Sequence, residues 1–597
     1  MKNQFRAAAL GAVLLTAGCA TMPAERSTVG DYLAGRFAAG ENDVAAAARF
    51  YDAAAKARPG EDDLKREAFV YALAAGDVDA AARQAAVLSD DKETGGLART
   101  VLAASAIKKG ALAAAKAALD DETQEPFTRT ISYLMRAWID KGLEGPDKAI
   151  ADLSSGPDDL FKGFNPTFIA ILEEEKGDIN SARAAYAVWL QAHSGPSFGD
   201  PVGQSSYGAF LERNGTAEEA KTYYAILAQS PGAMRSAAEA ALARVEEGRP
   251  STEYLNLSSA EGSALAFYLF AGNILQQSAG ERQRAAAAGF NVGAPEYTLP
   301  LALGQLAVYL DSDNSGARRL VGSILNIYGD HAAARRALDP IPPTSPDYEQ
   351  SRIDIATSLA AEKRVGEAIS YLERAIRADP DAQEARLTLA NMYMREGRSD
   401  EAIATMTTAI GRLSQTPEEG DWRYFVTRAA AQIELNRWPG AEKDLKRAVE
   451  IAPEEPVALN YLGYSWAERG DHLNEAFKLI EKAVELAPES GAITDSLGWA
   501  HYQRGDYEEA RVSLEKAAAL EPADPTITDH LGDAYWRLGR KKEARFQWAR
   551  ALELNPTDTV KKSLMDKIEN GLDAAAPKTQ RPEDEKGGAP APATTSR

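Results

Sequence analysis

Apolar and polar positions recur in one order towards the C-terminus of this chain of 597 residues. Three segments share the pattern, and the apolar stretch after each of them stops at a proline: YLGYSWAERG before Pro488, SLGWAHYQRG before Pro522 and HLGDAYWRLG before Pro556. The prolines lie 34 residues apart, a period typical of stacked helix pairs. Because one pair cannot bury its apolar face alone, the pattern predicts an all-α solenoid with an extended surface.

Each position of the period has a packing role. Gly463, Gly498 and Gly532 lie inside the first helix of a pair, where a missing Cβ lets a neighbouring helix approach. Gly470, Gly505 and Gly539 are expected to end that helix, because glycine adopts left-handed backbone angles easily. The second helix carries small and bulky apolar residues until its proline stops it. These residues are Ala476, Ile480 and Ala483, then Ala510, Leu514 and Ala517, then Ala544, Trp548 and Ala551.

These marks resemble those of the tetratricopeptide repeat, and the resemblance implies a right-handed superhelix with six repeats over about residues 349–558. We therefore predict a well-formed array over 346–570 and degenerate repeats over 31–345, where the same spacing is blurred. Residues 571–597 mix proline, glycine and charge, which predicts a disordered tail. An alternative is a separate helical domain at about 255–330, where GFNVGAPEYTLPLA interrupts the period.

The N-terminus predicts export and lipidation. Lys2 and Arg6 precede an apolar run that is too short to cross a bilayer, so residues 1–18 have the layout of a signal peptide. LTAGC resembles the lipobox of bacterial lipoproteins, which implies that Cys19 is acylated and that residues 19–30 form a tether. Ala20 favours the outer membrane under the sorting rule known from enteric bacteria. The alternative is an incidental thiol in a cleavable signal.

Charge narrows the range of partners. With 67 basic and 88 acidic residues, the chain has a net charge of −21, which disfavours nucleic acid and an anionic membrane surface. A chain with one cysteine cannot form an internal disulfide. Because no second apolar stretch is long enough to span a bilayer, the lipid on Cys19 is the expected membrane anchor.

Catalytic motifs are missing from the sequence. We find no phosphate-binding loop, nucleophile elbow, zinc-binding HExxH helix or dinucleotide fingerprint. The five histidines never occur at metal-ligand spacing, and paired carboxylates such as Asp90 and Asp91 fall where helices should end. We therefore predict no enzyme activity, no cofactor, no metal site and no small-molecule substrate. An enzyme site in the irregular region 255–330 is the alternative.

The resemblance to tetratricopeptide proteins implies a binding surface, because in that family the first helices line a concave groove. Aromatic side chains in such a groove can bury a large area at small entropic cost. For Tyr502 and Trp536 the alternative is a packing role alone. The groove lacks the cluster of lysines and arginines that would clamp a terminal carboxylate. The positions that the resemblance implies are Asn391, Met394, Arg395, Tyr464, Glu468, Trp499, Tyr502, Asp533, Trp536 and Arg537.

A lipobox followed by many repeats resembles the large tetratricopeptide lipoproteins of Gram-negative bacteria. Among them are adaptors that partner a periplasmic carboxy-terminal processing protease and present peptidoglycan hydrolases to it. This resemblance implies a scaffold on the periplasmic face of the outer membrane that holds its protein partners at high effective concentration. The alternative is an assembly factor for an envelope machine such as a pilus, a secretin or a polysaccharide exporter.

Overall fold

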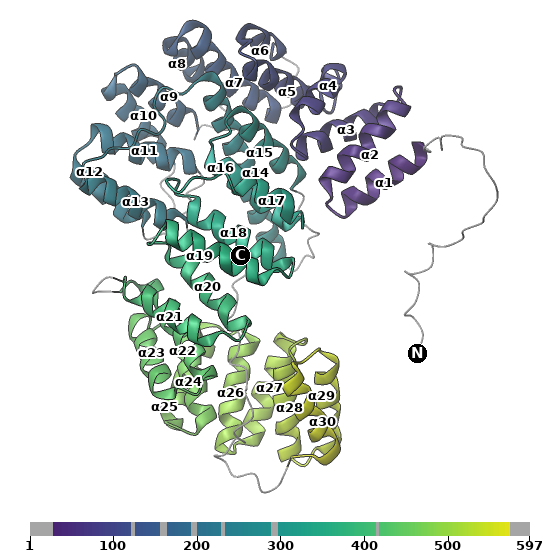
Figure 1. Cartoon of the computed structure of the whole chain (residues 1–597), viewed down its shortest axis with the longest axis vertical. Coiled ribbons are helices and arrows are strands. Elements are labelled where there is room, and N and C mark those ends of the chain that lie inside the picture. Colours follow the sequence, from purple (N-terminus) through teal and green to yellow (C-terminus); the bar gives the residue numbers. More distant parts are fainter. Residues whose placement is uncertain are drawn as a thin grey trace, which may run out of the picture. The chain divides into compact units, whose positions relative to one another are not determined.

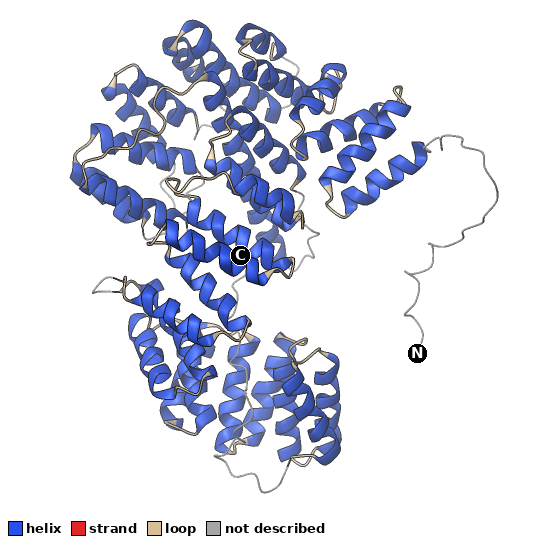
Figure 2. Cartoon of the chain, in the orientation of Figure 1, coloured by secondary structure: helices blue, strands red, loops and turns tan. Residues whose placement is uncertain are grey.

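The computed structural model describes residues 28–120, 126–155, 164–192, 200–228, 233–287, 297–413 and 417–572. These residues form helices α1 to α30 and one short 3-10 helix, η1 (Glu419–Asp421), and include no strand (Figures 1 and 2). The predicted all-α solenoid of tetratricopeptide-type helix pairs is confirmed. The predicted signal peptide, Cys19, residues 20–27 of the tether and residues 573–597 of the tail lie outside the described residues.

The chain divides into two compact units, residues 1–229 with 238–337 and residues 230–237 with 338–597. The first described helix begins at Thr28, nine residues after Cys19. The helices from Thr28 to Leu338 are α1 (Thr28–Gly40), α2 (Val44–Ala57), α3 (Asp62–Ala74), α4 (Val78–Leu88), α5 (Gly95–Lys108), α6 (Leu112–Ala118), α7 (Pro126–Glu144), α8 (Pro146–Ser154), α9 (Asn165–Glu175), α10 (Ile179–Ala192), α11 (Pro201–Asn214), α12 (Ala217–Leu227), α13 (Ala233–Glu246), α14 (Ser259–Ala287), α15 (Thr298–Leu310), α16 (Ser315–Ile327) and α17 (His331–Leu338).

The helices of the second unit are more uniform in length, and most of them have 13 or 14 residues. They are α18 (Tyr348–Ala361), α19 (Val365–Ala378), α20 (Gln383–Arg395), α21 (Ser399–Ile410), α22 (Trp422–Glu434), α23 (Trp438–Ile451), α24 (Pro456–Arg469), α25 (Leu473–Leu486), α26 (Gly491–Arg504), α27 (Tyr507–Leu520), α28 (Pro525–Arg537), α29 (Lys541–Glu553) and α30 (Asp558–Asn570).

In the first unit, two helices lie against helices from much earlier in the chain. α15 packs against α3, α4 and α5, and α14 packs against α5, α7 and α11 (Figure 1). Phe69 on α3, Phe270 on α14 and Leu303 on α15 belong to one buried core. The described residues 255–287 and 297–330 therefore pack within the first unit and share its core, which argues against the separate domain considered from the sequence.

One glycine shows how closely α14 approaches α7. Trp138 on α7 is fully buried and meets Phe168 edge-on, with 5.8 Å between the ring centroids. A Cβ on Gly262 of α14 would overlap the indole ring of Trp138. Because residue 262 has no side chain, α14 can lie in direct contact with α7.

In the second unit, the ends of the helices follow the sequence marks. Gly470 and Gly505 cap α24 and α26 with φ angles of 74° and 86°, in the left-handed region that favours glycine. The second helices α25, α27 and α29 end at Leu486, Leu520 and Glu553, before the three prolines of the period. The helix boundaries predicted from glycine and proline are confirmed here.

Contacts inside each pair explain the glycines of the first helices. A Cβ on Gly498 of α26 would lie 2.5 Å from Cγ of Leu514 on α27, and one on Gly463 of α24 would lie 2.7 Å from Cγ1 of Ile480 on α25. Leu514 and Ile480 are both fully buried. The glycines therefore bring the first and second helices together over a close-packed contact.

Glu349 at the start of α18 makes the second unit sensitive to pH. Its carboxylate accepts a hydrogen bond of 2.9 Å from the backbone N–H of Ala385 on α20, and burial raises the pKa of Glu349 to about 7. Because this folded-state pKa exceeds the ordinary value of 4.5, folding favours the protonated acid. Its contribution to stability is complete below about pH 4.5 and is lost as the pH rises through 7.

We expect Glu349→Gln to stabilise the second unit at pH 8 by up to about 3 kcal/mol and to change little at pH 4. Urea unfolding at the two pH values measures this difference, with the exposed Glu489→Gln as a matched control. Equal stabilisation at both pH values would contradict a titration effect.

Candidate protein-binding face

The first helices of the second unit form a series of direct neighbours. In the order α18, α20, α22, α24, α26 and α28, each helix contacts the next. Side chains at equivalent positions of these helices therefore point to one side, because the repeat places them at the same point of each pair. We call this surface the first-helix face and define it by the ten residues implied by the sequence, from Asn391 on α20 to Arg537 on α28.

At the α20 end, the face is only partly open. Asn391 and Met394 are half-buried, whereas Arg395 is exposed. Met394 also packs against the apolar cores on both sides of α20. Of the three, Arg395 therefore offers the most surface to a partner.

The residues of α24 that belong to the face are Tyr464 and Glu468, and both side chains are half-buried. Beside them Tyr461 is buried, and burial together with the carboxylates of Glu434 and Glu468 raises the pKa of its hydroxyl. Glu434 on α22 and Glu468 on α24 thus bring negative charge to the same part of the face. This part of the face would attract a basic side chain more readily than a carboxylate.

Stacked rings dominate the face on α26. Trp499 and Tyr502 lie parallel, with 4.7 Å between centroids and 6° between planes. His530 of α28 also stacks on Trp499, at 4.1 Å and 18°. Arg537 donates a hydrogen bond of 3.0 Å to the hydroxyl of Tyr502. The structure therefore joins Trp499, Tyr502 and Arg537 into one cluster that spans two repeats.

The other two residues on α28 are held by internal contacts. Asp533 is only 4% exposed, accepts a hydrogen bond of 2.9 Å from the indole of Trp548 and pairs with Lys567 at 3.0 Å. Trp536 packs against Trp548, with Lys541 and Arg545 within 5.0 Å of its ring centroid. A Cβ on Gly571, which follows α30, would overlap Trp536. Asp533 and Trp536 thus serve the packing of α28, α29 and α30.

Sequence reasoning missed several polar residues of this face. Asp495 accepts two contacts of 3.0 Å from His530, and Lys567 of α30 pairs with Asp529 at 2.8 Å. Burial opposes a charge on His530, but the carboxylate of Asp495 outweighs burial, so the pKa of His530 is raised. A sequence signal was available, because Asn460, Asp495 and Asp529 each lie four residues before Tyr464, Trp499 and Asp533.

Two buried polar atoms near the first-helix face lack partners among the described residues, as does Nδ1 of His501 on α26. Oδ1 of Asn460 and Nε1 of Trp499 are buried and find no hydrogen-bond partner among the residues that the structure describes. Asn460 is 7% exposed and lies on the same side of α24 as Tyr464 and Glu468, since these residues are spaced by four. A buried polar atom without a partner is costly, so these two atoms lower the stability of the packing around α24 and α26.

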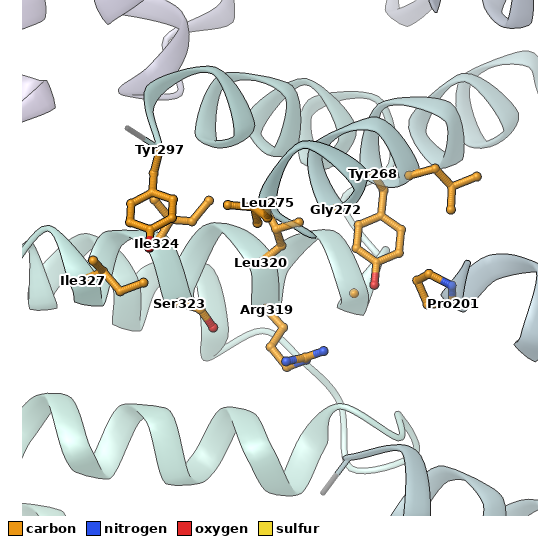
Figure 3. A pocket seen from close by; sticks show the side chains of 12 residues that line it. Pro201, Tyr268, Gly272, Leu275, Tyr297, Arg319, Leu320, Ser323, Ile324 and Ile327 are labelled. Atoms are coloured by element: carbon orange, nitrogen blue, oxygen red, sulfur yellow. The ribbon is translucent and has the colours of Figure 1, made fainter. Parts of the chain in front are cut away.

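The pocket of the first unit has a different chemistry. It has a volume of about 260 Å³ and is formed by α14, α16, Pro201 and Tyr297 (Figure 3). Most of the lining is apolar, and its polar side chains that can donate hydrogen bonds are Tyr268, Tyr297, Arg319 and Ser323. The described lining contains no carboxylate or histidine for acid–base catalysis. It therefore gives no support to an enzyme site in the region 255–330.

Metal binding and membrane spanning find no support in the described part of the chain. No group of three or more His, Cys, Asp or Glu residues there is arranged to hold a metal ion. None of its helices combines the length and the apolar character that crossing a bilayer requires.

Comparisons with known proteins agree with the repeat pattern. Two family models described as tetratricopeptide repeats match residues 359–418 and residues 426–491 and 496–559. No curated protein matches the chain.

Among solved structures, the APC/C hetero-tetramer Cut9–Hcn1 is similar at 16% identity over 84% of this chain and 94% of its own, with a TM-score of 0.36. A tetratricopeptide repeat protein from Parabacteroides merdae ATCC 43184 matches at 18% identity over 37% of this chain and 85% of its own, with a TM-score of 0.31. YrrB, described as a TPR protein with an unusual peptide-binding site, matches at 21% identity over 32% and 91%, with a TM-score of 0.24. From the family models, the 34-residue period and the paired helices, we conclude that residues 359–418, 426–491 and 496–559 of this chain are tetratricopeptide repeats.

Proposed function

We propose that the protein is a lipid-anchored scaffold that binds extended segments of protein partners along the first-helix face of its second unit. Tetratricopeptide repeats typically bind proteins and are generally non-catalytic, which fits a scaffold. The observation that carries the proposal is the run of half-buried side chains on two neighbouring first helices, Tyr464 and Glu468 on α24 and the stacked Trp499 and Tyr502 on α26. An extended peptide can lay its side chains against such rings while its backbone groups bond to the polar side chains of the groove.

The anchor in this proposal is Cys19, acylated within LTAGC and retained at the periplasmic face of the outer membrane. The partners that we propose are a periplasmic carboxy-terminal processing protease and peptidoglycan hydrolases, which a scaffold would hold at high mutual concentration. The support for the anchor and for these partners is the sequence resemblance described above.

We expect Tyr464→Ala combined with Trp499→Ala to lower the capture of these partners at least tenfold. The two changes remove aromatic area from α24 and α26, and aromatic side chains are frequent anchors of protein interfaces. Crosslinking in cell envelopes followed by mass spectrometry measures the capture.

Phe546→Ala is the matched control, because Phe546 is an aromatic residue that is 66% exposed on the second helix α29. Thermal unfolding must show that the double variant keeps its fold. Unchanged capture by a folded double variant would refute the first-helix face as the binding site. Recovery of pilus, secretin or exporter subunits alone would replace the adaptor with an assembly factor, and unlabelled Cys19 after feeding with a fatty-acid probe would refute the anchor.

A further inference from the structure

The first helix of the chain has an apolar face that no described residue covers. Val29, Leu33 and Phe37 on α1 are 51%, 58% and 71% exposed. They lie four residues apart, so they form one stripe along about 12 Å of the helix. A contiguous apolar stripe on a surface helix indicates a contact with an apolar partner.

The opposite face of α1 packs against α2. Ala38 is buried in a small core with Tyr51 and Ala54 of α2. A Cβ on Gly35 would be 3.1 Å from the ring of Tyr51. Because α1 already packs against α2 through this inner face, the stripe is not needed for folding and remains available to another partner.

The charge of the outer face is unusual for this protein. Within α1 its exposed residues include no carboxylate, although the whole chain has 88 acidic residues, and the nearest exposed carboxylate along the described chain is Glu41, directly after the helix. Residues 28–58 carry four acidic and four basic side chains, so their net charge is zero, against −21 for the chain. The exposed residues of the face are Val29, Gly30, Leu33, Arg36, Phe37 and Gly40.

This composition suits an anionic lipid surface. Along α1 the outer face brings apolar side chains and one cation, Arg36, and the exposed carboxylate that follows in register, Glu41, lies at the helix end that is farther from Cys19 along the chain. A helix of this kind lies in the plane of the interface and places its apolar side chains at the boundary of the acyl chains.

The length of chain before α1 keeps the stripe close to the proposed anchor. Nine peptide steps separate Cys19 from Thr28, and such a segment spans at most about 30 Å when fully extended. A lipid on Cys19 would therefore hold α1 within about 30 Å of the bilayer at all times. At that distance even a weak affinity of the stripe for the interface is sufficient for persistent contact.

We infer that α1 lies on the membrane surface and inserts Val29, Leu33 and Phe37 into the lipid interface as a second attachment beside the acylated Cys19. This inference rests on the lipid anchor of the proposed function. A second apolar contact adds to the attachment that the lipid provides. The contact also fixes how the first repeat meets the membrane.

An environment-sensitive dye on a single engineered cysteine tests this contact. The lipidated full-length Phe37→Cys protein is labelled with nitrobenzoxadiazole and reconstituted into vesicles of phosphatidylethanolamine and phosphatidylglycerol. We expect the emission at residue 37 to shift to the blue, to rise at least twofold and to be quenched by spin-labelled lipid. Phe546→Cys is the matched control, since Phe546 is 66% exposed on α29 and should report water.

The outcomes separate the inference from the anchor on which it rests. If the dye at residue 37 reports water as it does at residue 546 while the protein stays bound, the inference is overturned. If the dye also labels residue 19 in the purified protein, the anchor fails independently. A blue shift that depends on protein concentration without vesicles would assign the stripe to a second copy of the chain and would also overturn the inference.

A vesicle assay without the lipid on Cys19 gives an independent measurement. Unacylated Cys19→Ser protein should still bind the same vesicles weakly, and adding Leu33→Ser with Phe37→Ser should lower the partition coefficient at least tenfold. Equal partition of the two proteins would also overturn the inference, whereas an equal change with Phe546→Ser would show that the effect is not specific to α1.

Discussion

Replacing Gly262 with alanine should destabilise the first unit by about 3 kcal/mol, because the added Cβ would overlap the buried indole of Trp138. The ring cannot move aside easily, since it is fully buried and packs edge-on against Phe168. The cost arises from displacing α14 from α7. Urea unfolding and hydrogen exchange in peptides of α7 and α14 measure it.

Gly280→Ala provides the matched control on the same helix. No atom lies within 4 Å of a Cβ at residue 280, so this change should stabilise α14 by about 0.5–1 kcal/mol through helix propensity alone. Gly262→Ala combined with Trp138→Leu should recover part of the lost stability. If the two glycine changes had the same sign and size, the close approach of α14 to α7 would be disproved.

Replacing Lys567 with methionine should destabilise the C-terminal end of the second unit by about 3–5 kcal/mol. Nζ of Lys567 lies 2.8 Å from Asp529 and 3.0 Å from Asp533, and the three side chains are at most 17% exposed. Burial lowers the pKa of Lys567, but the two carboxylates outweigh burial and raise it, so Lys567 carries its positive charge in the fold. Without the ammonium group, two carboxylates would remain buried with no cation between them.

A double change checks that this cost comes from charge. Lys567→Met combined with Asp529→Asn removes one carboxylate with the cation and should recover at least half of the lost stability. Thermal unfolding of the single and double variants measures both values. A loss below about 1 kcal/mol for Lys567→Met would mean that the contact behaves like an exposed surface ion pair.

The sequence predicted those parts of the fold whose contacts repeat. Gly498 faces Leu514 only sixteen residues later, and the equivalent contact recurs at Gly463 and Gly532, so one period describes these three pairs. The contact of Gly262 with Trp138 has no counterpart in another repeat and joins residues more than one hundred positions apart. Such a contact leaves no periodic mark, which is why the packing of α14 and α15 inside the first unit was not predicted.

The candidate binding face shows the same limit. The repeat predicted that Trp499 and Tyr502 would share one side of α26 with residues of α28, and the structure joins Tyr502 to Arg537. The repeat could not predict that Asp533 is used by Lys567, because Lys567 lies on α30, beyond the last proline of the period. Pairing between charged side chains depends on which helix covers the end of the array.

The two units differ in how far apart in the chain their contacting helices lie. The main contacts of the second unit join helices one or two places apart, whereas in the first unit the side chain of Gln305 reaches the backbone carbonyl of Ala74, 231 residues away. The entropic cost of closing a loop rises with the number of residues between the two contacts, and high contact order slows folding. During synthesis from the N-terminus, α26 therefore meets its neighbours within one period. The contact of α3 with α15, in contrast, can form only after α15 has been made.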